Sequence, residues 1–255
     1  MKVSIITVTY NSSATLGDTL QSVASQKYSD IEHIIIDGAS TDDTLKIVEQ
    51  YSNNIACLVS EPDKGIYDAM NKGLMLVTGD IVGILNSDDI YMDELVITDV
   101  VACFMANPDT DAVFASLCFV KPTDMTSVVR IWKGSPYYPG AFSKGWHPAH
   151  PTFFVRRSVY AKYGCFDLDF DVSADFELML RLIEKHRIKT HFLNRTIVCM
   201  RMGGESTGSI QKIIKGNRNV VRAFHKNGLS VSPFYPLMRI LPKVWNVLKL
   251  KLQIT

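Results

Sequence analysis

The chain has 255 residues, of which 47% are hydrophobic and 21% charged, ordinary values for a globular protein of one large or two small α/β domains. No run of about 18 apolar residues occurs, which argues against a membrane-spanning helix, and a strand-like run directly after Met1 and Lys2 argues against a signal peptide. The five cysteines are widely spaced and form no CxxC pair, which is typical of a reducing cytoplasm.

The net charge of +1 conceals an asymmetry along the chain. Residues 206–255 contain nine Lys or Arg and no acidic residue, whereas residues 1–205 contain 18 basic and 26 acidic residues. An acidic body with a basic end is a hint of contact with an anionic surface.

Apolar runs alternate with helical patterns over the first 90 residues. Strands are predicted at 3–9, 33–37, 55–60 and 81–85, and amphipathic helices of 11–14 residues between them. This rhythm predicts an α/β fold with a parallel sheet covered by helices on both faces. No glycine-rich loop follows Thr9, which argues against a dinucleotide-binding turn and against a sugar-nucleotide pyrophosphorylase.

Asp88 and Asp89 follow the buried strand 81–85 directly. Ligands of open α/β sheets gather outside the carboxyl ends of the strands, and a pair of carboxylates there suits Mg²⁺ or Mn²⁺ shared with a phosphate. The alternative is a simple turn with a helix cap, because Asp and Asn favour both.

The second half of the chain has a looser pattern. Helices are predicted at 93–106, 174–186 and 210–226, the last ending at Asn227-Gly228. Strands are predicted at 112–120, 128–132, 152–155, 190–193 and 196–201.

Five segments in order, VSIITVTYNSS, IIIDGASTDDT, EPDKGIYDAMNKG, GDIVGILNSDD and SADFELMLRL, resemble the family-2 inverting glycosyltransferases of the GT-A fold. Within that family the chain looks like the bacterial enzymes that build O-antigen, capsule and exopolysaccharide. The resemblance covers residues 1–206 and implies a GT-A domain, with a nucleotide-sugar half at 1–106 and an acceptor half at 107–206. Residues 207–255 then form a basic helical extension.

The resemblance implies a nucleotide pocket in the first half. In the family, an acidic residue at the end of the second strand contacts the uracil of a UDP-sugar, and Asp37 matches it. Tyr10 matches a position that packs beside the base. Lys64 and Gly65 match the loop, and Asn71 the helix, that complete the pocket.

The family's metal-binding acidic element matches Ser87-Asp88-Asp89, and its last carboxylate, here Asp89, usually holds the cation with Asp88 beside it. Asn86 and Ser87 stand where some relatives have a third acid. Mn²⁺ or Mg²⁺ is therefore the implied cofactor. A diphosphate about 4–5 Å from a carboxylate costs about 3–4 kcal/mol at an effective dielectric of about 20, and a divalent cation reverses the sign of that interaction.

The family's catalytic base begins a late helix, commonly in a Glu-Asp pair, and here the pair is Ala174-Asp175. Asp175 is therefore the implied base; a helix cap is the alternative role. Glu177 points away from Asp175 on a helix and is the second candidate base. His147 and His150 are either metal ligands or ordinary loop residues, and we expect His150 near the acceptor or the diphosphate.

The implied activity is inverting transfer of a hexose or N-acetylhexosamine from a UDP-sugar to a saccharide acceptor on polyprenyl diphosphate, in O-antigen or lipopolysaccharide-type biosynthesis. Two alternatives stay open: a non-catalytic nucleotide-sugar-binding module, and a transferase that uses a GDP- or dTDP-sugar. No nucleic-acid partner is expected.

Residues 237–254 mix basic and apolar side chains, which is typical of segments that lie on membranes. The basic residues there are Arg239, Lys243, Lys249 and Lys251. We expect a cytoplasmic protein held peripherally on the inner leaflet by this segment. The apolar stripe of the helix 210–226 is expected to pack on the catalytic domain instead.

Overall fold

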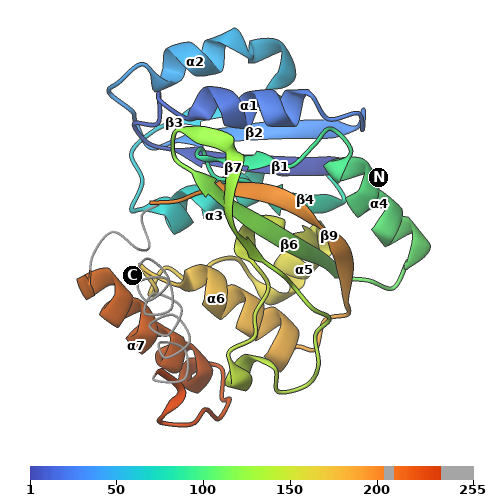
Figure 1. Cartoon of the computed structure of the whole chain (residues 1–255), viewed down its shortest axis with the longest axis vertical. Coiled ribbons are helices and arrows are strands. Elements are labelled where there is room, and N and C mark those ends of the chain that lie inside the picture. Colours follow the sequence, from blue (N-terminus) through green and yellow to red (C-terminus); the bar gives the residue numbers. More distant parts are fainter. Residues whose placement is uncertain (204–209, 237–255) are drawn as a thin grey trace, which may run out of the picture.

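The computed structural model describes residues 1–203 and 210–236 (Figure 1). The strands are β1 (Val3–Thr9), β2 (Ile31–Asp37), β3 (Cys57–Ser60), β4 (Ile81–Ile84), β5 (Asp89–Tyr91), β6 (Ala112–Lys121), β7 (Asp124–Trp132), β8 (Phe154–Arg156) and β9 (Thr190–Arg201). The α-helices are α1 (Leu16–Ala24), α2 (Thr44–Gln50), α3 (Ile66–Leu76), α4 (Val96–Ala106), α5 (Arg157–Tyr163), α6 (Ala174–Met179) and α7 (Ile210–Lys226).

The first four strands form the parallel part of the sheet, in the order β3-β2-β1-β4. Every residue of β1 is buried, as expected of a strand with helices on both faces. The register pairs Thr9 with Asp37 and Asp37 with Ser60, so these strands end at one edge. The predicted α/β fold is confirmed in this half.

The sheet continues through β8, β6, β9 and β5 with mixed strand directions. β9 lies parallel to β6, whereas β5 and β7 are antiparallel to their partners. The two strands predicted at 190–193 and 196–201 are a single strand, β9. The predicted break between them corresponds to an irregularity in the register of β9 with β6. β5 and α5 are elements that the sequence pattern did not predict.

Helices cover both faces of the sheet, as Figure 1 shows. Alternate residues of the parallel strands face opposite ways: Ile6, Ile34 and Val82 contribute to a core shared with α3, α5, α6 and α7. Ile5 and Ile81 contribute to the core under α4, and Ile35 to the one under α1 and α2. Gly73 allows α3 to lie close to β1, because a Cβ there would come within 2.5 Å of the Ile6 side chain.

α7 packs against α6 rather than standing apart from the rest of the chain. Its residues Val220, Ala223 and Phe224 are buried in the core that contains α6. Beyond α7, Tyr235 is also buried and its hydroxyl donates to the Phe142 carbonyl at 2.7 Å. This agrees with the expectation that the apolar stripe of the helix packs on the domain.

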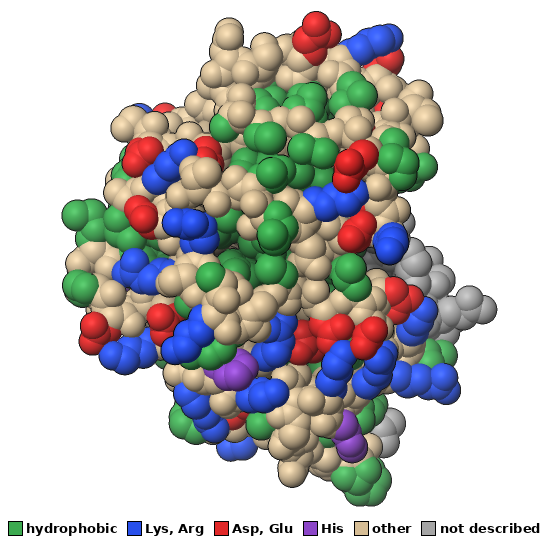
Figure 2. All heavy atoms as spheres, turned by 180° about the vertical axis from the view of Figure 1, so that it is seen from behind, with side chains coloured by type: hydrophobic (Ala, Val, Ile, Leu, Met, Phe, Trp, Pro, Cys, Tyr) green, Lys and Arg blue, Asp and Glu red, His purple; other side chains and the backbone are tan. Residues whose placement is uncertain are grey.

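The basic side chains of α7 face an acidic loop that leads into α6. Lys215 pairs with Asp171, and Lys226 pairs with Asp169 at 2.7 Å and with Asp167. Opposite charges are likewise interspersed over the face in Figure 2. Each exposed pair contributes only about 0–1 kcal/mol to folding, but together they neutralise much of the charge of α7.

No helix within residues 1–203 and 210–236 is long and apolar enough to cross a membrane. The basic segment 237–254 lies outside the described residues.

Candidate active site

The loops after β1, β2 and β4 meet at the carboxyl edge of the sheet. Ser12, after β1, lies 2.9 Å from Ser87, after β4, between their hydroxyl oxygens. Asn11 donates its backbone N–H to the Ser40 hydroxyl at 2.8 Å. Three loops that are distant in the sequence therefore form one surface.

Asp37 and Tyr10 lie together on this surface. The Asp37 carboxylate is fully buried and accepts hydrogen bonds from the Ser40 backbone N–H at 3.0 Å and the Ser60 hydroxyl at 2.6 Å. The Tyr10 ring is 62% exposed and lies beside Gly38, where an added Cβ would approach it within 3.3 Å. The exposed ring offers a flat apolar face to a planar base. Asp37 is buried and already bonded to Ser40 and Ser60, so its contact with a base stays a prediction.

Lys64 and Gly65 form an exposed loop immediately before α3. The Gly65 N–H donates to Asp63 at 2.8 Å, and the Lys64 N–H donates to Asp68 at 3.0 Å. Gly65 has a φ of +115°, a conformation that glycine adopts readily. This geometry leaves the loop backbone next to the Tyr10 and Asp37 surface, since Asp63 also approaches Gly38.

Asn71 has a different environment from the rest of the predicted pocket. Its side-chain amide donates to the Phe166 carbonyl and accepts from the Phe166 N–H, both at 2.9 Å. Both functional groups of the amide are thus used in clamping the loop around Phe166 to α3. A direct contact between Asn71 and a nucleotide stays a prediction.

The acidic pair lies where the chain passes from β4 into β5. Asp88 is half-buried, and Asp89, the first residue of β5, is fully buried. Burial raises the pKa of Asp89 well above its usual value, and the charge of Asp88 raises it further. Burial also raises the pKa of Asp88.

Among the described residues, two buried oxygens at the acidic pair have no hydrogen-bond partner. They are Oδ1 of Asp89 and Oδ1 of Asn86, while the other Asp89 oxygen accepts from the Asn86 amide at 3.3 Å. An unpartnered buried oxygen is costly unless a ligand satisfies it. Two hard oxygens beside a second carboxylate therefore fit Mg²⁺ or Mn²⁺, which take oxygen ligands.

Arg201 is a functional candidate that sequence reasoning missed. It ends β9, and since Asp89 pairs with Met200, the same register carried one residue further sets Arg201 opposite Asp88. Its guanidinium pairs with Asp18 of α1 and donates to the Pro122 carbonyl at 2.8 Å. Its charge lowers the pKa of both acids against the effect of burial. No local pattern could have indicated a partner so distant in the sequence.

Asp175 occupies the first turn of α6 and faces α3. Its Oδ1 accepts a hydrogen bond from the Tyr67 hydroxyl at 3.1 Å. The N-cap, Ser173, has the left-handed φ of +69° and makes no side-chain cap bond. Asp175 is half-buried, and its bond to Tyr67 connects α6 to α3, the helix that follows the Lys64 loop.

Glu177 is turned away from Asp175, as the helical spacing predicts. Only 2% of it is exposed. Its carboxylate pairs with Arg181 at 3.0 Å and accepts from the Asn227 amide at 2.9 Å. Arg181 also donates to the Cys165 carbonyl at 2.6 Å. Glu177 therefore joins α6, α7 and the preceding loop, a role in stability.

We expect Glu177→Gln to lower stability without abolishing turnover. Loss of one partner of a buried pair costs about 3 kcal/mol, which lowers Tm by about 6–12 °C in a chain of this size. Thermal unfolding and kcat, measured beside Asp175→Asn, separate the two carboxylates. An inactive Glu177→Gln protein of native Tm would reverse the assignment.

His147 and His150 have separate surroundings. His147 lies edge-on to Trp132 and to Phe176, with ring centroids 5.0 and 5.5 Å apart. His150 lies edge-on to Phe166 at 5.7 Å; burial lowers its pKa, and the nearby Asp175 charge partly offsets this effect. Within the described residues, neither histidine belongs to a group of three or more potential metal ligands.

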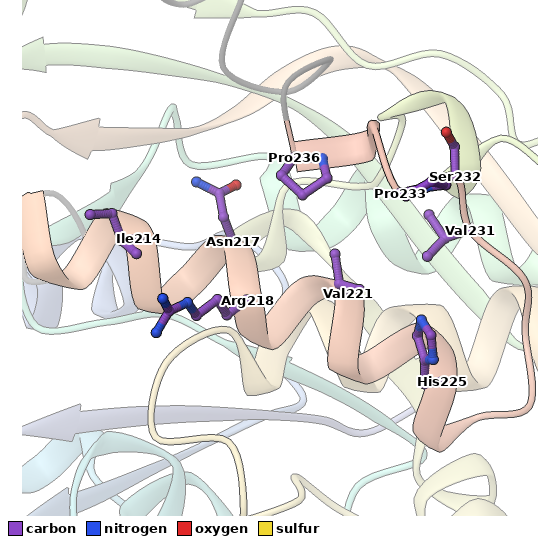
Figure 3. Close-up of a pocket in the computed structure, with 9 residues that line it drawn as sticks. All are labelled: Ile214, Asn217, Arg218, Val221, His225, Val231, Ser232, Pro233 and Pro236. Carbon is purple, nitrogen blue, oxygen red and sulfur yellow. The ribbon is translucent and has the colours of Figure 1, made fainter.

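A separate hollow of about 760 Å³ lies between α7 and the segment 231–236 that follows it. Figure 3 shows Ile214, Val221 and His225 of α7 on one wall and Val231 and Pro236 on the other. No residue of the predicted nucleotide pocket, acidic pair or base lines it.

Solved structures share this fold. S. aureus TarS (residues 1–349, in complex with UDP-GlcNAc) matches with a TM-score of 0.67 and 20% identity over 90% of this chain and 68% of that chain. The mannosyltransferase PcManGT from Pyrobaculum calidifontis, in complex with GDP-Man and Mn²⁺, matches with a TM-score of 0.65 and 24% identity over 93% of this chain and 68% of that one. The fold is thus that of the GT-A sugar-nucleotide transferases.

Sequence comparison defines the family within that fold. Residues 4–164 match the family described as Glycosyl transferase family 2. An uncharacterized glycosyltransferase of Mycobacterium tuberculosis is 34% identical over 181 residues, which are 70% of this chain and 68% of the relative. The chain belongs to glycosyl transferase family 2, as its five ordered motifs indicated.

Proposed function

We propose that the protein is an inverting, metal-dependent hexosyltransferase. It moves a hexose or N-acetylhexosamine from a UDP-sugar to a saccharide acceptor on a lipid diphosphate, in bacterial surface polysaccharide synthesis. The observation that carries the proposal is the unpartnered, buried Asp89 oxygen at the carboxyl edge, beside the Tyr10 and Asp37 surface. Family membership and the UDP-GlcNAc complex of TarS support the reaction class and the donor.

Each part of the donor has a proposed contact. Tyr10 packs on the uracil and Asp37 accepts its N–H, while Lys64 and Gly65 line the pocket next to Asn71. Asp89, with Asp88 beside it, holds Mn²⁺ or Mg²⁺; the Mn²⁺ in the PcManGT complex supports this choice. A cation held there would supply positive charge to stabilise the departing UDP.

Asp175 is the proposed base. Its carboxylate accepts the proton of the acceptor hydroxyl as that oxygen attacks the anomeric carbon. A single displacement from the face opposite UDP inverts the anomeric configuration. Two observations support this role: Asp175 is half-buried, and the Tyr67 hydroxyl holds one of its oxygens. A base must be both positioned and accessible to the acceptor.

The direct test is a hydrolysis and transfer screen of UDP-, GDP- and dTDP-sugars with Mn²⁺ present. We expect turnover with a UDP-hexose or UDP-N-acetylhexosamine. Turnover with only GDP- or dTDP-sugars would reject the donor assignment. Binding of a UDP-sugar without turnover, even with acceptors supplied, would favour a non-catalytic binding module.

The proposed division at residue 206 separates the residues that carry the reaction from the C-terminal extension. It does not separate two cores, because α7 shares a core with α6. Lys215 already pairs with Asp171, Lys226 pairs with Asp167 and Asp169, and Arg222 donates to the Asp169 carbonyl. The membrane contact is therefore assigned to residues 237–254.

Deletion of residues 237–255 should release the protein from anionic liposomes and leave UDP-sugar hydrolysis intact. Four basic residues at about 1 kcal/mol each favour anionic over neutral vesicles by up to about 10³-fold. Cosedimentation at low and high salt measures this difference. Equal binding of the full and shortened chains, or equal binding to neutral vesicles, would contradict the membrane role.

A further inference from the structure

In the Asp175 carboxylate, Oδ1 has a hydrogen-bond partner, and Oδ2 has none among the described side chains. Oδ1 accepts from the Tyr67 hydroxyl at 3.1 Å. No other side chain in the described parts of the chain donates to either oxygen. A carboxylate has two oxygens and several acceptor positions, so the Tyr67 bond selects which oxygen stays open.

Tyr67 is itself held in place by its neighbours. Its ring stacks on Phe166, with centroids 5.5 Å apart and an angle of 28° between the planes. The backbone of Phe166 is clamped from both sides by Asn71. Because Asn71 follows Tyr67 by four residues, both side chains lie on one face of α3. The Tyr67 ring is thus packed on a residue whose backbone is itself bonded to α3.

The direction of the hydrogen bond is fixed by chemistry. Burial raises the pKa of Tyr67 well above its usual value, and the charge of Asp175 adds to the effect. The phenol therefore keeps its proton at any working pH and acts as the donor. The Asp175 carboxylate is therefore the acceptor of this bond.

α3 also connects Tyr67 to the proposed donor loop. The Lys64 N–H donates to Asp68, and the Gly65 carbonyl accepts from the N–H groups of Asp68 and Ala69 at 2.9 and 3.2 Å. Tyr67 lies in this first helical turn. A displacement of the loop therefore displaces the hydroxyl that orients Asp175.

We infer that Tyr67 is a positioning residue for the reaction, which holds Asp175 with Oδ2 directed to the acceptor hydroxyl and ties that orientation to the donor loop. The inference rests on the proposed role of Asp175 as the base. It assigns a task to a residue in the first half of the chain, whereas the base itself belongs to the second half. Tyr67 need not touch either substrate.

The test is Tyr67→Phe, which keeps the ring and its stack on Phe166 and removes only the oxygen. Loss of a hydrogen bond to a charged, oriented group should lower kcat by about 10–100-fold. The Kd of UDP, measured by calorimetry, should stay within about twofold, since no donor contact is lost. A merely structural defect would lower Tm and weaken UDP binding as well. Tyr160→Phe, which removes the oxygen of another buried tyrosine in the same core, is the matched control and should keep native kcat.

A double variant separates the inference from the proposed function. If Tyr67 acts through Asp175, Tyr67→Phe on an Asp175→Asn background should cause no further loss of kcat. Independent, multiplied losses would overturn the inference, as would native kcat in Tyr67→Phe when Asp175→Asn is inactive. Raised UDP Kd with unchanged kcat would likewise overturn it by making Tyr67 a donor residue. A fully active Asp175→Asn protein would reject the proposed base itself.

Discussion

Asp175→Asn should lower kcat by about 10²–10⁴-fold, the usual effect of losing a positioned base, while UDP binds with nearly native affinity. Asn cannot take up the proton of the attacking hydroxyl, yet its side-chain oxygen can still accept the Tyr67 hydrogen bond. The fold around α6 should therefore persist, with Tm close to the native value. Single-turnover transfer and calorimetric UDP titration measure the two effects separately.

Glu177→Gln is the matched control for this experiment, because it lies two residues away on the same helix and its partners are Arg181 and Asn227. We expect the two variants to fail in opposite ways, one in turnover and the other in stability. Transfer by Asp175→Asn at a rate within about threefold of native would remove Asp175 from the mechanism, since a positioned base contributes far more.

Asp89→Asn should abolish Mn²⁺ binding and transfer, and EDTA should do the same to the native protein. A cation contributes several kcal/mol to the stabilisation of a developing charge, so we expect a loss of about 10³-fold or more. Tm of the metal-free variant should not fall, because the buried Asp89 carboxylate carries an unpartnered oxygen that is costly in the native protein.

Electron paramagnetic resonance of Mn²⁺ provides a readout that does not depend on activity. Asp80→Asn, just before the opposite end of β4, is the control: Asp80 accepts from the Lys2 backbone N–H at 3.0 Å and lies far from the carboxyl edge. It should bind Mn²⁺ like the native protein. Undiminished Mn²⁺ binding by Asp89→Asn, or full activity in EDTA, would contradict the metal assignment.

The parallel half of the sheet was predictable because its strands are short apolar runs buried on both faces. The predicted strand 3–9 is β1, and 81–85 contains β4. β5 was not predictable in this way. Its three residues, Asp89, Ile90 and Tyr91, form a strand only because β9 pairs with them from the other half of the chain.

The charges of α7 show the limit of composition. The count of basic residues after Ser206 indicated an anionic surface, but part of that surface belongs to the protein itself: Asp167, Asp169 and Asp171 meet Lys215 and Lys226. An excess of charge along a sequence does not reveal where an opposite charge lies in space, because ion pairing depends on distances that folding creates.

The sequence by itself determined the family, the four parallel strands of the first half and the identity of the acids that follow them, since those depend on local apolar runs and motif order. Tertiary structure decided the surroundings of each acid. Glu177 is enclosed by Arg181 and Asn227, whereas Asp175, two residues earlier, accepts from one hydroxyl of α3 among the side chains that the structure describes. A helix turns by about 100° per residue, so two carboxylates that are two residues apart lie on nearly opposite sides of α6 and face different elements. Only the packing of α3 and α7 against α6 determined which of them stayed open.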